Sequence, residues 1–92
     1  MIHVVQLSTR AKKDLRSVPR YVAIKLLSWV DDVEQNGLEQ VKKRPGLHDE
    51  PLRGKRQGQR SVRLNRAYRT IYCIRENKIE FVEVMEVNKH AY

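Results

Sequence analysis

Eight basic side chains crowd into residues 51–75, a stretch without any aspartate or glutamate. Seven of the eight are arginine, whose planar guanidinium matches the geometry of phosphate oxygens. The basic residues of this stretch are Arg53, Lys55, Arg56, Arg60, Arg63, Arg66, Arg69 and Arg75. The whole chain carries 19 Lys and Arg against 11 Asp and Glu, so its entire net charge of +8 resides in the stretch. The pattern predicts a surface that binds a polyanion, with an ordinary solvated basic face as the alternative.

Two short motifs border or lie within this stretch. The triplet His48-Asp49-Glu50 precedes it and could form a metal site or an acid/base set. No second cluster stands at metal-ligand spacing, so we expect neither a metal nor another cofactor. Gly54 and Gly58 bracket three polar residues and permit a tight loop whose backbone can approach a phosphate, although the spacing is not that of a P-loop.

The length of 92 residues predicts one domain over 1–92 with a modest core. Cys73 is the only cysteine, which excludes an internal disulfide and favours a reducing, cytoplasmic location; we expect it to be buried in a strand. No apolar run approaches the length of a membrane span, and the N-terminus is too short and too uncharged for a secretory signal.

Hydrophobic periodicity predicts the elements that must position the basic residues. An apolar stripe of period 3.6 marks the second helix, and alternating apolar residues mark the strands. The expected stripe consists of Val22, Ala23, Leu26, Leu27, Val30 and Val33. Trp29 lies beside it and should pack against the first helix rather than stack on a base. The predicted elements are a strand at 2–7, helices at 9–17 and 19–36, a helical turn at 38–43, and strands at 59–65, 68–75 and 79–87.

This order predicts an α+β fold, β-α-α-β-β-β, in which two N-terminal helices pack on one face of an antiparallel sheet. Alternation along 68–75 places Arg69, Ile71 and Cys73 on one face, and Tyr68 and Tyr72 on the face that joins the core. The other face, with Arg63 and the loop charges, should be open, concave and rich in arginine.

Three segments of the chain, in this order of elements, resemble the RelE/ParE toxin superfamily. They are residues 52–64 (LRGKRQGQRSVRL), residues 68–72 (YRTIY) and the tail 88–92 (NKHAY). The nearest branch is similar to the RelE/HigB mRNA interferases. The resemblance covers the whole chain. It implies the toxin of a type II toxin–antitoxin pair that cuts mRNA in the ribosomal A site, without a metal, and is blocked by an antitoxin expected to be acidic.

The resemblance also implies a set of site residues. Arg69 resembles the recurrent strand arginine of the family, and Arg63 the basic residue of the preceding strand. His90 or Tyr92 resembles the C-terminal residue implicated in acid/base work. Some members carry a carboxylate or extra histidines near the centre of the site; here only Glu50 and His48 come close in sequence, which leaves the general base open. The residues expected to contact RNA or the ribosome are Arg53, Lys55, Arg56, Arg60 and Arg66.

RNA can be cut by its own 2′-OH, which attacks the adjacent phosphorus and leaves a 2′,3′-cyclic phosphate and a 5′-OH end. Arginine is permanently protonated, so Arg63 and Arg69 can only stabilise charge on the phosphorane. Histidine ordinarily titrates near neutrality, so His90 suits proton transfer. Tyrosine has a reference pKa of about 10, so Tyr92 could act as a base only if nearby arginines favoured its ionised form strongly. Tyr92 could instead stack on a nucleobase.

Two other functions remain open. A ParE-like inhibitor of DNA gyrase would share the fold without cutting RNA, but that branch is expected to lack the catalytic arginine and the terminal His or Tyr. A plain nucleic-acid-binding module would bind in a salt-dependent way without cleavage. A membrane-surface role is disfavoured, because the basic residues lie on strands and loops rather than on an amphipathic helix.

Overall fold

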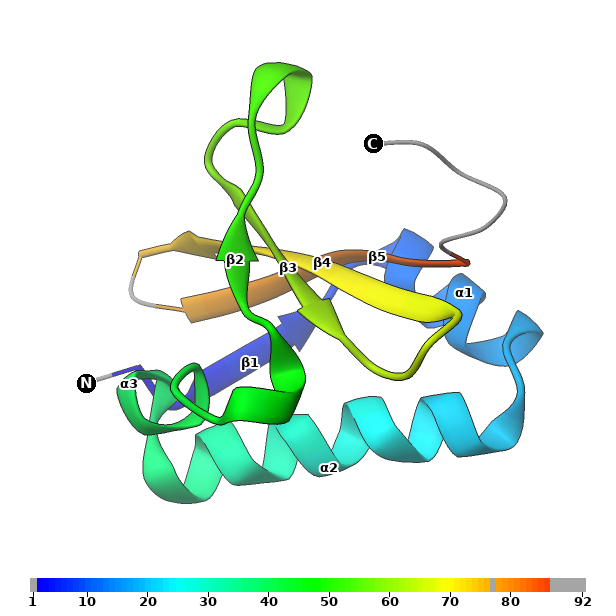
Figure 1. Cartoon of the computed structure of the whole chain (residues 1–92), viewed down its shortest axis with the longest axis horizontal. Coiled ribbons are helices and arrows are strands. Elements are labelled where there is room, and N and C mark those ends of the chain that lie inside the picture. Colours follow the sequence, from blue (N-terminus) through cyan, green and yellow to red (C-terminus); the bar gives the residue numbers. More distant parts are fainter. Residues whose placement is uncertain (1, 77, 87–92) are drawn as a thin grey trace.

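The computed structural model describes residues 2–76 and 78–86. Two main helices lie on one side of a twisted sheet, with the longer helix along the lower edge of the molecule in Figure 1. The elements in chain order are β1 (Val4–Leu7), α1 (Thr9–Ser17), α2 (Arg20–Asn36), α3 (Leu38–Val41), a 3-10 turn (Pro45–Leu47), β2 (Glu50–Pro51), a 3-10 turn (Gly54–Arg56), β3 (Gln59–Arg63), β4 (Tyr68–Arg75) and β5 (Lys78–Glu86). This confirms the α+β class and the predicted order of helices and main strands.

Local sequence signals set the helix boundaries. The hydroxyl of Ser8 caps α1 by accepting a hydrogen bond of 2.9 Å from the backbone N–H of Ala11. Pro19 separates α1 from α2, because its ring allows a helix to begin but not to continue through it. Gly37 ends α2 with φ of 83°, a left-handed conformation that glycine adopts at little cost.

The described strands form a five-stranded sheet in the order β1-β5-β4-β3-β2. β2, β3, β4 and β5 pair antiparallel, but β1 pairs in parallel with β5, from Val4 opposite Lys78 to Leu7 opposite Phe81. The sheet is therefore mixed, and the expectation of a wholly antiparallel sheet was wrong. β2 has only two residues and was not predicted, because so short a strand carries no periodicity.

The core lies between the helices and the face of the sheet that carries Val62, Leu64 and Tyr72. From α2 it receives Val22, Leu26, Trp29 and Val33. Trp29 is buried, and its ring contacts the ring of Tyr72 on β4, at 5.5 Å between ring centroids. It shares the core cluster with Ala11 of α1, so its expected packing against the first helix stays a prediction. Leu27 was placed in the buried stripe and is instead 52% exposed.

The opposite face of β3 and β4 carries Ser61, Arg63, Arg69, Ile71 and Cys73, because directly paired residues share a face. Cys73 is buried, as predicted. Ser61 and Ile71 are buried as well, so this face is less open than expected. None of the helices in the described part of the chain is long and apolar enough to cross a membrane.

Candidate functional site

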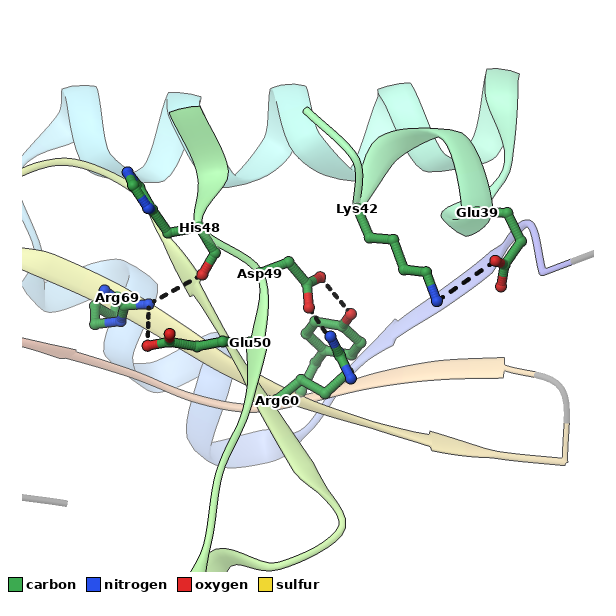
Figure 2. A network of polar contacts seen from close by, with 8 residues as sticks. Glu39, Lys42, His48, Asp49, Glu50, Arg60 and Arg69 are labelled. Atoms are coloured by element: carbon green, nitrogen blue, oxygen red, sulfur yellow. Dashed lines mark hydrogen bonds and ion pairs between the residues drawn. The ribbon is translucent and has the colours of Figure 1, made fainter. Parts of the chain in front are cut away.

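Arg69 lies at the centre of the sheet face that points away from the helices. Its side chain is 12% exposed and is held from three sides. The Nε atom donates a hydrogen bond to the hydroxyl of Ser61 on the neighbouring strand. The Nη2 atom lies 3.3 Å from the carbonyl oxygen of His48 and 3.5 Å from Oε1 of Glu50 (Figure 2). The guanidinium is therefore preorganised rather than free to sample solvent.

Arg63 is the direct cross-strand partner of Arg69, so both guanidinium groups project from the same face. Its Nε atom donates to the carbonyl oxygen of Asn65 at 3.4 Å, just beyond the strand end. Two like charges opposite each other destabilise a sheet. A bound anion would relieve that repulsion, so the arginine pair favours the binding of a phosphate.

Glu50 supplies a carboxylate to this site and was not among the predicted site residues. Its register opposite Ser61 places it on the face of Arg69, and its side chain remains 60% exposed. The sequence offered one signal, an acidic residue directly before the long basic stretch. The pairing of β2 with β3 brings it to Arg69, which is 19 residues away in the chain.

Asp49, the neighbour of Glu50, points to the other side of the sheet (Figure 2). Its side chain is completely buried and accepts two short hydrogen bonds, one of 2.6 Å from Nε of Arg60 and one of 2.5 Å from the Tyr72 hydroxyl. Asp49 and Glu50 point to opposite faces of the sheet, as successive residues of an extended segment do. Asp49 therefore anchors the segment that carries Glu50 and the His48 carbonyl.

The environment of Tyr72 fixes its protonation state. Burial, together with the hydrogen bond to and the charge of Asp49, raises the pKa of Tyr72 far above its usual value near about 10, although Arg60 opposes the shift. Tyr72 thus remains a hydrogen-bond donor throughout the physiological range. It is a structural residue, as predicted, and not a candidate base.

A second ion pair fixes the start of the same loop. Arg44 binds Asp32 of α2 in a bidentate manner, with Nε to Oδ2 at 2.7 Å and Nη2 to Oδ1 at 2.9 Å. Hydrogen bonds from Arg44 and then Asn36 lower the pKa of Asp32. The segment between Arg44 and Glu50 is therefore fixed at three points: Arg44 binds α2, Asp49 binds Arg60 in the core, and Glu50 binds Arg69.

The predicted basic residues fall into three groups. Arg53, Lys55 and Arg56 lie at the tip of the β2–β3 hairpin, which projects beyond the sheet at the top of Figure 1. Arg66 lies in the exposed turn between β3 and β4, at the other end of β3. Arg60 projects from the core face of β3, where it pairs with Asp49. The structure thus does not bring the five residues together.

The remaining predicted site residues, His90 and Tyr92, lie outside the described residues. Within residues 2–76 and 78–86, no group of three His, Cys, Asp or Glu side chains could hold a metal ion.

Comparison with known proteins identifies the family. A family profile described as "ParE toxin of type II toxin-antitoxin system, parDE" matches residues 5–91. No curated protein sequence shows a significant match. Solved structures are similar in fold, among them YafQ from E. coli strain BL21(DE3), with a TM-score of 0.75, 17% identity, and coverage of 91% of this chain and 92% of that chain.

Two further similar structures are complexes. The archaeal RelE–RelB complex from Pyrococcus horikoshii OT3 contains a chain with a TM-score of 0.73 and 21% identity, covering 98% of this chain and 100% of that one. The YoeB–YefM complex from Staphylococcus aureus contains one with a TM-score of 0.69 and 20% identity, covering 96% and 95%. The profile match over nearly the whole sequence decides the assignment: the chain belongs to the ParE toxin family of type II toxin–antitoxin systems, within the RelE/ParE superfamily.

Proposed function

We propose that this toxin is an endoribonuclease that cuts mRNA on the ribosome by 2′-OH attack. The observation that carries the proposal is the preorganised Arg69, fixed by Ser61, the His48 carbonyl and Glu50, with Arg63 directly opposite. A largely desolvated guanidinium that is held by three partners stabilises charge that develops on a phosphorane more strongly than one in water would. Because ribosomes lie in the cytoplasm, the toxin would act there.

In the proposed reaction the 2′-oxygen loses its proton to a base and forms a bond to the adjacent phosphorus. The bond from phosphorus to the 5′-oxygen then breaks, and an acid donates a proton to that leaving oxygen. Arg69 and Arg63 bind the non-bridging oxygens and stabilise the extra negative charge. The nucleophile comes from the RNA itself, so the products are a 2′,3′-cyclic phosphate and a 5′-OH end.

Glu50 is our candidate for the general base. It is the carboxylate that contacts Arg69, and its high exposure leaves one side of it accessible to a bound nucleotide. Its Oε1 atom lies 3.5 Å from Nη2 of Arg69, so a phosphate bound by Arg69 would lie close to this carboxylate. Proton transfer by a positioned side chain typically contributes about 10²–10⁴-fold to the rate.

His90 and Tyr92 stay predictions for the acid that protonates the leaving oxygen. Their assignment rests on the resemblance of the tail to that of the interferases and on the titration range of histidine. Arg53, Lys55, Arg56 and Arg66 are proposed to bind the backbone of RNA in the ribosome, from the two ends of β3. Arg60 is better assigned to structure than to RNA, since its charge is compensated by buried Asp49.

An antitoxin is the proposed protein partner. Similar toxins were crystallised as RelE–RelB and YoeB–YefM complexes. The net charge of +8 favours an acidic partner, and an antitoxin that covers the Arg69 face would block access of RNA.

A second candidate function, inhibition of DNA gyrase, is favoured by the match to the ParE profile. It needs no proton-transfer groups and no preorganised arginine. The contacts that fix Arg69 beside a carboxylate support the nuclease instead, because a binding surface alone would not require them.

The experiment that decides between the two uses purified 70S ribosomes with an empty A site, programmed with a defined mRNA. Naked mRNA and a gyrase supercoiling assay run in parallel. Cleavage that depends on ribosomes and yields a cyclic phosphate and a 5′-OH end is the expected result. Intact mRNA together with inhibited supercoiling would overturn the nuclease proposal in favour of the gyrase inhibitor.

A further inference from the structure

Helix α2 is apolar on two opposite sides. One side carries Val22, Leu26, Trp29 and Val33 into the core. On the other side Ile24 and Leu27 are 53% and 52% exposed. These two side chains form a small exposed apolar patch at the middle of a helix side that is otherwise charged.

The exposed side has the spacing of a helix–helix seam. Arg20, Ile24, Leu27, Asp31 and Glu34 are all exposed and are separated by four, three, four and three residues. This is the alternation of a and d positions in a heptad repeat, which aligns one stripe of side chains along a partner helix. We call these five residues the α2 outer seam.

The charges of the seam are arranged for an antiparallel copy of itself. Arg20 and Asp31 are equally distant from the midpoint between Ile24 and Leu27. When two α2 helices pack antiparallel about that midpoint, Ile24 of each meets Leu27 of the other. Arg20 of each then lies beside Asp31 of the other, whereas a parallel pairing would place like charges together.

The overall charge of α2 also differs from that of the rest of the protein. The helix contains Arg20 and Lys25 against Asp31, Asp32 and Glu34, and Arg44 pairs with Asp32, so the charges of α2 are close to balanced in a chain of net charge +8. Two copies can therefore approach through α2 with less repulsion than through any surface near residues 51–75. The same charge balance argues against a polyanion as the ligand of this side.

We propose that the α2 outer seam is a self-association surface, through which two copies of the toxin pair antiparallel about a twofold axis. One helix per copy makes a small interface, so the dimer is weak and in equilibrium with the monomer. Because α2 packs on the core face of the sheet, its outer side points away from the face that carries Arg69 (Figure 1). Both Arg69 sites stay accessible in such a dimer, and the inference does not depend on the nuclease proposal.

The test is sedimentation velocity of the isolated full chain over a range of concentrations. The unmodified chain should show a reversible monomer–dimer equilibrium. Ile24→Glu should weaken the dimer by at least about tenfold, because it places a charge at the centre of the seam. Arg20→Asp and Asp31→Arg should each weaken it several-fold, and the double variant Arg20→Asp/Asp31→Arg should restore it, since the pairs are then exchanged but still opposite in sign.

Lys12→Asp is the matched control, because it makes the same change of charge as Arg20→Asp on the exposed side of α1. It should leave the equilibrium unchanged. A chain that stays monomeric at every concentration, or a dimer indifferent to Ile24→Glu, would overturn the proposal. A double variant no better than the single ones would refute the antiparallel register. Loss of antitoxin binding in Ile24→Glu, with a monomeric parent chain, would assign the seam to the antitoxin instead.

Discussion

The two faces of the β3–β4 hairpin use arginine in opposite ways. On the core face Arg60 meets the buried carboxylate of Asp49 at 2.6 Å, and Tyr72 satisfies the second oxygen of that carboxylate. On the outer face Arg69 meets a hydroxyl, a backbone carbonyl and the largely exposed carboxylate of Glu50. The first arrangement is closed and electrically balanced, whereas the second has an arginine opposite an arginine and a carboxylate that is 60% exposed.

The comparison teaches that residue type does not identify a functional arginine. What distinguishes Arg60 from Arg69 is whether the partner carboxylate is inaccessible or open to solvent. Three consecutive residues, 48–50, build both environments: Asp49 and Glu50 point to opposite faces, and His48 contributes its backbone carbonyl to Arg69 (Figure 2). Stability and proposed chemistry should therefore be separable by substitutions at neighbouring positions.

The largest effect is expected for Arg69→Ala in the ribosomal cleavage assay. Loss of a preorganised donor typically costs about 10²–10³-fold in rate, and we expect the upper end because the guanidinium is held by three partners. Arg75→Ala is the control, since it removes an exposed arginine from the same strand. Equal losses in both variants would mean that charge in general, and not the site, supports activity.

Asp49→Ala should mainly lower the free energy of unfolding, by about 3 kcal/mol, because it leaves Arg60 and the buried Tyr72 hydroxyl without their acceptor. Urea unfolding followed by the signal of Trp29 measures this. Glu39→Ala removes an exposed carboxylate that pairs with Lys42 at 3.4 Å and should change stability by less than about 0.5 kcal/mol. An unchanged free energy of unfolding in Asp49→Ala would show that the contacts of Asp49 with Arg60 and Tyr72 do not stabilise the fold.

Glu50→Gln should lower the rate of cleavage rather than the stability, in contrast to Asp49→Ala. We expect cleavage to fall by about 10²-fold, as for the loss of a general base, while the free energy of unfolding changes little because the side chain is largely exposed. Single-turnover cleavage and urea unfolding are measured on the same preparation. Unchanged cleavage would remove Glu50 from the mechanism.

The smallest effect is expected for Tyr72→Phe, about 1 kcal/mol of stability at neutral pH from the loss of one hydrogen bond. The dependence on pH sharpens the assignment. The folded protein keeps the phenol protonated, whereas the unfolded chain releases the proton above about pH 10, so stability falls as the pH rises through that value. Tyr72→Phe has no phenol to ionise, so its free energy of unfolding does not fall in this way. The difference in free energy of unfolding between the variant and the unmodified chain should therefore shrink above about pH 10. A constant difference across that range would contradict the raised pKa.

Much of the fold followed from local signals. Ser8, Pro19 and Gly37 mark helix boundaries by cap, ring and left-handed backbone, and both main helices were found within one residue. The alternation along Tyr68–Arg75 separated Tyr72 from Arg69 correctly. These features could be predicted because each is decided by residues adjacent in the chain.

The failures depend on contacts between distant segments. Leu27 lies on a second apolar stripe of α2, and periodicity cannot tell which of two stripes faces the core. The meeting of Glu50 with Arg69 requires the two-residue strand β2, which has no pattern of its own. Arg60 and Arg69 are alike in sequence, and only the burial of Asp49 separates their roles.

The position of β5 in the sheet has a consequence for synthesis of the chain. Among the described strands β1 is made first, yet its hydrogen-bonding partner is β5, which is made last of them and also separates β1 from β4. Until residues 78–86 leave the ribosome, β1 and β4 must both present unpaired edges, which favour aggregation and proteolysis. Closing the sheet joins residues as distant as Val4 and Lys78, so the last step of folding should be slow compared with helix formation. Nascent chains truncated before β5 should therefore be eliminated as unfolded protein rather than accumulate as partly active toxin.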